Sequence, residues 1–274
     1  MTLAVSQHPR GVGAWERGGG VDSAQLRRMH ASHVLVMVER VDGRVEEDAA
    51  ILRDCDAVRA AGAEPYLWAF HGKEALDEPE AAAERLTRLL RPAGAHGVVC
   101  NEERPAFGRG AALARLFRAI VDRIDERHSI GVGSYPLARF HPDFPWEACR
   151  IGYGLAETYQ LAQHRTLVRE ALDDWRTWHP SRPGGEAFAQ HPPRVVLPCP
   201  AAFETSSPGI GAEQLAADLP RICLDDRGVI DVPGVTVWSL EQIGRKEERV
   251  LAELAERFRD ARAEDDTRPI GTQR

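Results

Sequence analysis

The sequence has very little lysine and lacks the common metal, redox and nucleotide motifs. Lys73 and Lys246 are the only lysines among 35 basic residues, so the positive charge is almost entirely arginine. The net charge of −7 argues against nucleic acid or an anionic membrane as a partner. The odd number of cysteines and the absence of a C-x-x-C pair argue against a disulfide framework and against structural zinc. We therefore expect no metal and no cofactor, with the five cysteines (Cys55, Cys100, Cys149, Cys199, Cys223) in a reducing compartment.

The first residues also lack the marks of a targeting segment. Met1 to His8 contain no charged region followed by an apolar one, and no apolar run in the chain is long enough to span a membrane. We expect a cytoplasmic protein without a signal peptide, whose export would require association with a larger particle.

Short apolar runs alternate with stretches of helical periodicity along the whole chain. This alternation is typical of a parallel sheet with crossover helices. The eight apolar runs are Gly11–Trp15, His33–Val38, Pro65–Phe70, Gly97–Cys100, Ile130–Tyr135, Ile151–Gly154, Arg194–Leu197 and Val235–Ser239. The expected helices are 23–30, 46–61, 80–90, 110–126, 163–178, 211–219 and 245–263, several of them with a capping residue before or a glycine after them. The prolines of 141–146 predict short turns there instead of a helix.

Eight such units predict an α/β fold of the (β/α)₈ TIM barrel type, in a single domain of residues 1–264 followed by a polar tail, 265–274. A doubly wound open sheet is the alternative. That fold carries a glycine-rich phosphate loop after its first strand, whereas Gly18-Gly19-Gly20 lacks the G-x-G-x-x-G spacing. The barrel is therefore the favoured architecture.

In a TIM barrel the functional residues lie at the carboxyl ends of the strands. That rule selects residues rich in carboxylates and aromatic rings: Trp15, Glu16, Glu39, His71, Asn101, Glu102, Glu103, Tyr135, Glu157, Tyr159, Phe203, Glu204, Trp238, Ser239 and Glu241. Aromatic rings stack on the faces of sugars, and two carboxyl groups suffice to cleave a glycosidic bond. Each of these residues could equally anchor a loop, and His71 could be a wall residue instead of a proton shuttle.

Glu102 and Glu103 follow the fourth strand directly. Neighbouring residues of a strand point to opposite sides, so only one of the two can face the barrel axis. The other is then a surface residue or an ion-pair partner.

Three segments resemble the glycoside-hydrolase-like TIM barrels, a family similar to bacterial and phage muramidases and often found beside phage-tail or contractile-injection genes. They are Ser134-Tyr135-Pro136 with His141-Pro142-Asp143-Phe144-Pro145-Trp146, then 155–160, and then 198–204 with Val237-Trp238-Ser239-Leu240-Glu241. The resemblance covers about Gly11 to Glu248 and implies an O-glycosyl hydrolase acting on a bacterial cell-wall or related amino-sugar polymer. It also implies a polysaccharide ligand and proteins of a tail-like particle as partners.

The chain departs from the family pattern at two positions. Where these barrels usually carry D-x-E after strand four, this chain has Asn101-Glu102-Glu103, and where they usually carry glutamine after strand six it has Glu157. Two explanations remain open. Either Glu103 is the general acid and Glu157 replaces the lost aspartate, or the barrel has lost catalysis and now binds a glycan or builds a larger assembly.

We favour the first explanation. It assigns catalysis to Glu103 and Glu157, and substrate binding to Trp15, Glu16, His71, Asn101, Tyr135, Tyr159, Trp238 and Glu241. The separation of the two carboxyl groups is the decisive quantity: roughly 5 Å suits a retaining mechanism and roughly 6.5–9.5 Å an inverting one. Side chains that point away from each other would favour the second explanation.

Overall fold

The computed structural model describes residues 8–40, 42–149, 152–158, 165–177, 195–200, 212–225 and 227–267. Eight parallel strands form one sheet in the order β7-β6-β5-β4-β3-β2-β1-β8. The Trp238 N–H donates to the Pro200 carbonyl at 2.9 Å, which brings the two ends of this order together in a nearly closed barrel. The strands are β1 (Gly11–Trp15), β2 (His33–Glu39), β3 (Glu64–Phe70), β4 (Gly97–Asn101), β5 (Ser129–Ser134), β6 (Tyr153–Ala156), β7 (Val195–Pro198) and β8 (Gly234–Val237).

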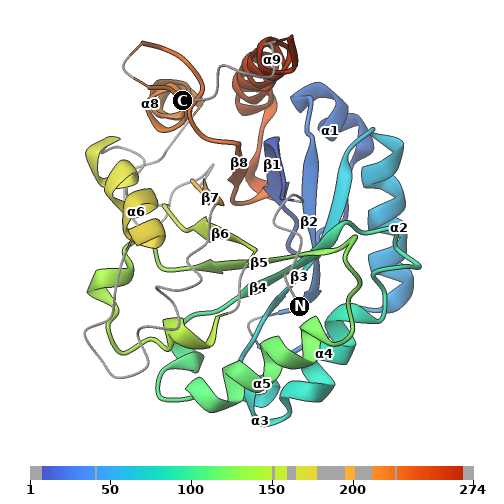
Figure 1. Ribbon diagram of the computed structural model, residues 1–274. Coiled ribbons are helices and arrows are strands. Elements are labelled where there is room, and N and C mark those ends of the chain that lie inside the picture. The colour runs from blue at the N-terminus through green and yellow to red at the C-terminus, as the bar shows by residue number, and fades with distance from the viewer. Residues whose placement is uncertain are drawn as a thin grey trace.

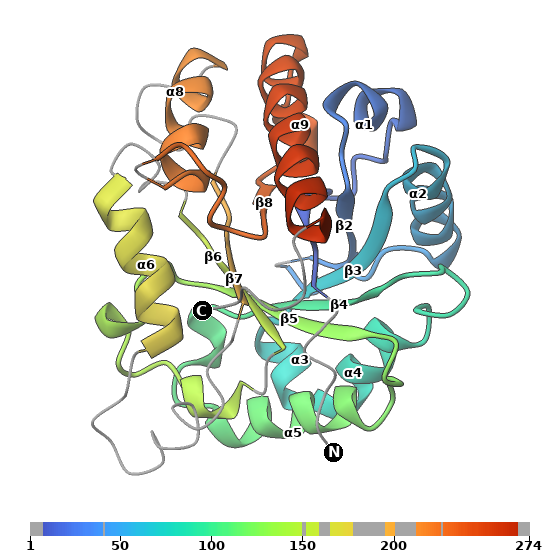
Figure 2. The same cartoon turned by 45° about the horizontal axis from the view of Figure 1, so that its top comes forward.

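Helices surround the strands on the outside (Figures 1 and 2). They are α1 (Ser23–Met29), α2 (Asp48–Ala60), α3 (Lys73–Asp77), α4 (Pro79–Thr87), α5 (Gly110–Val121), α6 (Arg165–Thr177), α8 (Ala212–Cys223) and α9 (Arg245–Thr267). Two short 3₁₀ turns, Ala138–Phe140 and Trp146–Ala148, replace a helix between β5 and β6. The (β/α)₈ prediction is confirmed, including the turns expected from the prolines. Helix α3 was not expected, and α9 continues to Thr267.

The barrel interior and the layer between strands and helices form two separate apolar clusters, because successive strand residues point to opposite sides. The interior cluster consists of Trp15, Leu35, Met37, Tyr66, Trp68, Phe70, Val99, Tyr153, Leu155, Leu197 and Cys199. Glycines make room for its large rings. A Cβ on Gly131 would lie 2.4 Å from the Tyr153 ring, and one on Gly133 would lie 3.1 Å from the Trp15 ring. The rings of Tyr153 and Trp15 therefore occupy space that a side chain at Gly131 or Gly133 would fill.

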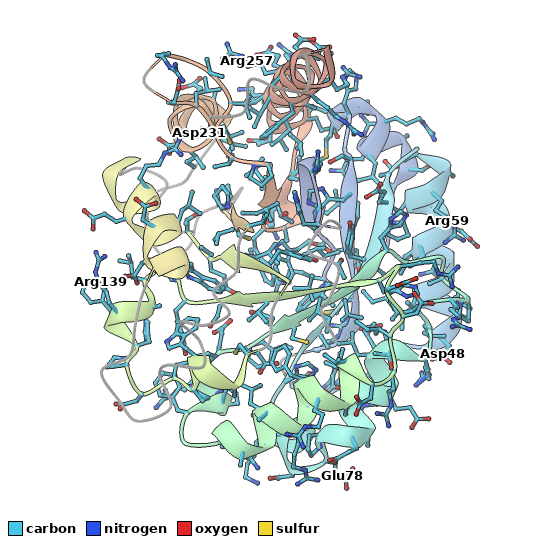
Figure 3. The ribbon with its side chains drawn as sticks, in the orientation of Figure 1. Asp48, Arg59, Glu78, Arg139, Asp231 and Arg257 are labelled. Atoms are coloured by element: carbon cyan, nitrogen blue, oxygen red, sulfur yellow. The ribbon has the colours of Figure 1, made fainter. Side chains whose placement is uncertain are left out.

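Charged side chains lie on the outside of the helical ring, as the labelled Asp48, Arg59, Glu78 and Arg139 show (Figure 3). Among the described residues, the exposed large hydrophobic side chains are Val45, Phe140 and Val229. None of the helices in the described ranges is both long and apolar enough to cross a membrane.

The close approach at Gly131 predicts a stability loss for a very small substitution. In Gly131→Ala the added methyl group must displace the fully buried Tyr153 ring, and overpacking of this kind costs about 1–3 kcal/mol. Gly244→Ala is the milder comparison, since its methyl group would meet only the end of the Glu247 side chain at the start of α9, and it should cost less than the Gly131 substitution. Denaturant unfolding of both variants measures the difference, and equal stabilities would contradict the packing described here.

Candidate active site

The end of β4 carries the central residues of the candidate site, and its neighbour β5 fixes their position. The Glu102 N–H donates to the Gly133 carbonyl at 2.9 Å, and the Ser134 hydroxyl donates to the Glu102 carbonyl at 2.5 Å. Val99 belongs to the interior cluster and Cys100 to the outer one. Strand alternation therefore turns Asn101 toward the barrel axis, where it meets the Trp15 ring over Gly133, and turns Glu102 toward the helices.

Asn101 connects Glu103 to Glu157. With its amide nitrogen toward β5 and β6, it donates to the Gly133 carbonyl at 3.1 Å and to Glu157 Oε1 at 2.7 Å. In the opposite orientation the nitrogen lies 3.5 Å from Glu103 Oε1. The first orientation gives the nitrogen two acceptors and leaves the amide oxygen facing Glu103, which can donate to it when protonated.

These contacts also limit the separation of the two carboxyl groups. The oxygen and nitrogen of an amide are about 2.3 Å apart, so the two Oε1 atoms cannot be more than about 8.5 Å from each other. The side chains of Glu103 and Glu157 therefore lie close together, as the hypothesis that both are catalytic requires. The bound is compatible with both the retaining and the inverting separation.

Both carboxyl groups hold their protons more tightly than ordinary glutamates. Burial raises the pKa of Glu157 well above its usual value, and the charge of Glu103 raises it further, while the hydrogen bond from Asn101 opposes the shift. Burial also raises the pKa of Glu103, and the Asn101 amide opposes this shift only in the orientation in which its nitrogen faces Glu103. The two groups titrate as a pair, and such a pair retains a proton at a pH where isolated carboxyls have lost theirs.

Neither carboxyl group is neutralised by a cation in the described part of the chain. The ion pairs found there involve other acids, such as Glu39 with Arg85 and Glu248 with Arg28. An arginine bound to Glu103 or Glu157 would have kept that group ionised and made proton donation difficult. The pair therefore remains available for acid–base chemistry.

Three tryptophans form the floor of the mouth. The ring centroids of Trp15, Trp68 and Trp238 lie 4.9–5.9 Å apart in edge-to-face contacts. Trp15 is fully buried and donates to Cys199 Sγ at 3.0 Å, and Trp68 donates to the Glu16 carbonyl at 2.8 Å. Trp238 is the partly exposed member, with the Arg17 guanidinium 5.0 Å from its ring centre.

Tyr135 belongs to a second aromatic cluster near the carboxyl pair. Its ring stacks on His141 at 3.8 Å and contacts Phe107 and Phe144 at about 6 Å. Burial raises the pKa of Tyr135 to about 12, and the charges of Glu103 and Glu157 contribute to the shift. The phenol therefore stays protonated at neutral pH and can donate a hydrogen bond next to the carboxyl pair.

Two predicted binding residues hold loops at the mouth. Both carboxylate oxygens of the buried Glu16 accept backbone N–H groups, from Gly20 and from Met37, at 3.2 Å. Burial is also the main reason why the pKa of Glu16 is raised. Glu241 is exposed, and its Oε1 accepts the Arg17 N–H at 2.6 Å.

His71 lies apart from the mouth residues, in a fully buried pair with Glu102. Its Nδ1 is 2.5 Å from Glu102 Oε1, and neither side chain is exposed. Burial alone would lower the pKa of His71, but the Glu102 carboxylate raises it above its usual value. Tyr159, Phe203 and Glu204 lie outside the described residues, so their places in the site stay predictions.

Sequence reasoning missed several residues of this region. Trp68 was overlooked because it stands two residues before the end of β3, although strand alternation with Phe70 could have placed it in the barrel. Phe107, His141 and Phe144 come from loops and turns, and nothing in their spacing predicts that they gather around Tyr135. The pairing of His71 with Glu102 depends on strand register, which the sequence leaves open.

No family model matches the chain, and no curated protein matches its sequence. Solved structures match its fold. A chitinase from Bacteroides thetaiotaomicron shares 10% identity at a TM-score of 0.65, with 93% of this chain and 98% of that one covered. The spore cortex-lytic enzyme SleL of Bacillus cereus shares 10% identity at a TM-score of 0.55 (89% and 74% covered), and human YKL-39, a pseudo-chitinase that binds chitooligosaccharides, shares 8% at 0.56 (90% and 99%). The chain therefore has the fold of the glycoside-hydrolase TIM barrels.

The raised pKa of Glu157 predicts a pH-dependent gain of stability on its neutralisation. A carboxyl group whose pKa is higher in the folded than in the unfolded state binds more protons when folded, so it lowers stability as the pH rises above the unfolded value. Glu157→Gln removes this effect. We expect it to raise the melting temperature at about pH 7 by at least about 2 °C, which corresponds to a gain of ~1 kcal/mol in unfolding free energy for a chain of this size. The gain should be smaller near pH 4.

Glu248→Gln is the matched control, because the hydrogen bond from Arg28 lowers the pKa of Glu248. A lowered pKa stabilises the fold above the unfolded value, so the same substitution there should lower the melting temperature at neutral pH. Melting curves of both variants at the two pH values measure these shifts. If both substitutions change the melting temperature in the same direction at neutral pH, the charge assignment of the pair is wrong.

Proposed function

We propose that the barrel mouth binds an amino-sugar polymer and cleaves its glycosidic bonds, with Glu103 as the general acid. The observation that carries this proposal is the meeting of Glu103 and Glu157 on the two sides of the Asn101 amide, with no arginine bound to either in the described residues. The common mechanism of glycosidic cleavage uses one protonated and one ionised carboxyl group, which is the charge state that such a pair favours.

The Asn101 amide favours this division of roles. In the orientation that gives its nitrogen two acceptors, its N–H donates to Glu157, which favours the ionised form of that carboxyl group and opposes the upward pKa shift that burial causes. Its carbonyl then faces Glu103, which favours the protonated form there. Glu103 then donates its proton to the leaving oxygen. Glu157 stabilises the positive charge that develops on the sugar, or orients the attacking water. The Tyr135 hydroxyl, protonated at neutral pH, supplies a hydrogen bond, and the exposed part of Trp238 supplies a surface for a sugar ring.

The similar structures support the choice of substrate class. Two of them are a chitinase and a spore cortex-lytic enzyme, and YKL-39 binds chitooligosaccharides. Chitin-type and peptidoglycan-type oligosaccharides are accordingly the substrates to test.

A barrel that binds such a glycan without cleaving it is the second candidate function. The amide at position 101 favours it, since an asparagine cannot ionise, and a binding protein with this fold exists in the pseudo-chitinase YKL-39. A role in a tail-like particle has less support, because the described surface carries only the scattered exposed side chains Val45, Phe140 and Val229 and not a sizeable apolar patch.

The assignment of Glu103 predicts a large loss of turnover in Glu103→Gln. Glutamine keeps the size and the hydrogen bonds of the side chain but has no acidic proton, and loss of a general acid lowers kcat about 10²- to 10⁴-fold. Release of reducing ends from peptidoglycan and from chitin-type oligosaccharides measures the effect. Glu253→Gln, at an exposed residue of α9 outside the barrel mouth, is the matched control and should keep turnover within about threefold.

Binding of the same oligosaccharides, measured by calorimetry, separates the two candidate functions. Hydrolysis requires that Glu103→Gln keeps its affinity and loses turnover. Affinity without turnover already in the wild type would support the binding barrel, and turnover unaffected by Glu103→Gln would rule out the assignment of the acid.

Asn101 and Glu157, the two departures from the family pattern, predict that substitutions at the two positions have coupled effects on stability. Asn101→Asp alone places a further carboxyl group against Glu157, where the amide nitrogen now donates at 2.7 Å, and should lower stability by about 1–3 kcal/mol. The double variant Asn101→Asp with Glu157→Gln recreates the usual arrangement and should regain most of that loss. Unfolding free energies of the double-mutant cycle measure the coupling, and strictly additive values would contradict it.

A further inference from the structure

A second cluster of chemically active side chains lies on the opposite side of β4 from the mouth. Phe70 pairs with Asn101 in the register of β3 and β4, so the next residues, His71 and Glu102, stand side by side. Cys100 precedes Glu102 by two positions and therefore points to the same side. One ligand atom from each of His71, Cys100 and Glu102 lies within 4.8 Å of the other two.

The cluster is completely buried and has unmet bonding capacity. His71, Cys100 and Glu102 are all 0% exposed. The hydrogen bond between His71 Nδ1 and Glu102 Oε1 leaves His71 Nε2 and Glu102 Oε2 without a partner. Buried polar atoms normally have partners, so the orphaned Glu102 Oε2, on the carboxyl group that faces His71 Nδ1, indicates that a further species belongs there, whereas His71 Nε2 lies on the other edge of the ring and needs a partner of its own.

We propose that His71, Cys100 and Glu102 bind a structural zinc ion between the barrel wall and the helices. Zinc is bound by imidazole nitrogen, thiolate sulfur and carboxylate oxygen, which are the three donor types present here. Magnesium and calcium require oxygen ligands throughout, so the thiol and the imidazole exclude them. The charges of Glu102 and a Cys100 thiolate would balance those of the ion.

The neighbouring Cys149 would have to move to become the fourth ligand, because the described ligand atoms within 4.8 Å of one another are those of His71, Cys100 and Glu102. Burial raises the pKa of the Cys100 thiol, and the charges of Glu102 and of the neighbouring Cys149 raise it further. Cys149 is itself buried and belongs to the same apolar cluster as Cys100. A thiolate is unfavourable in such surroundings without a cation, and zinc binding would release the thiol proton and supply that cation.

Zinc binding requires only a small rearrangement. A tetrahedral ion about 2.0–2.1 Å from nitrogen and oxygen holds these atoms about 3.3 Å apart, whereas His71 Nδ1 and Glu102 Oε1 are 2.5 Å apart. A shift of the Glu102 carboxyl group by less than about 1 Å opens this space. Glu39, which approaches the cluster from β2, is held by Arg85 from α4 and remains outside the ligand set.

The test is the metal content of the full chain, purified under reducing conditions and dialysed against metal-free buffer. We expect about one zinc per chain in the wild type. Substitution of the ion by cobalt should give the intense near-ultraviolet absorption of a thiolate-bound metal. Cys100→Ser should lose that absorption and at least about tenfold in zinc affinity. Cys223→Ser, at a buried cysteine of α8 far from the cluster, is the matched control and should keep both.

Measurements on the wild type alone keep the proposal testable if Cys100→Ser fails to fold. A strong chelator should lower the wild-type melting temperature by several degrees, and added zinc should restore it. Less than about a tenth of an equivalent of zinc after incubation with the ion, or cobalt spectra without a thiolate band, would overturn the proposal and leave the two orphaned atoms to a buried water.

Discussion

The structure around the candidate site depends on the hydrogen bonding of the end of β4 to both neighbouring strands. The Glu102 N–H is bound to the Gly133 carbonyl of β5, and the His71 N–H is bound to the Asn101 carbonyl of β4. These bonds continue the register of β4 with its two neighbours beyond Asn101, the last residue of the strand. They fix which side chain after the strand faces the axis and which faces the helices, and a shift by one residue would exchange the two sets.

The charge state of the mouth follows from this fixed arrangement. Burial raises the pKa of both glutamates, and a neutral amide between them is compatible with one proton shared by the pair. An ionised aspartate in place of Asn101 would put a third acid in the same small volume. Asn101 and Glu157 are therefore two parts of one electrostatic arrangement, in which a neutral amide lies between two carboxyl groups.

Hydrophobic periodicity was sufficient to predict the fold, since each expected strand overlaps an observed one and differs by at most two residues at either end. The rule that functional residues follow the strands selected residues that lie together in the structure, namely Asn101, Glu103, Glu157, Tyr135 and Trp238. It could not separate these residues from Glu16, whose carboxylate holds backbone N–H groups of a loop and of β2. Nor could it place Phe107 and His141, because loop conformation decides their position and no periodic pattern encodes it.

The prediction that the chain holds no metal rests on spacing in the sequence and stays a prediction, but strand pairing can bring possible ligands together without any short spacing. Metal motifs with short spacing arise when the ligands belong to one turn or helix. In a parallel barrel, residues of adjacent strands become neighbours although a whole helix separates them in the sequence, as His71 and Glu102 do. Because the two faces of β4 point in opposite directions, one strand end can supply an acid to the mouth and, in the proposed zinc site, two ligands to the wall.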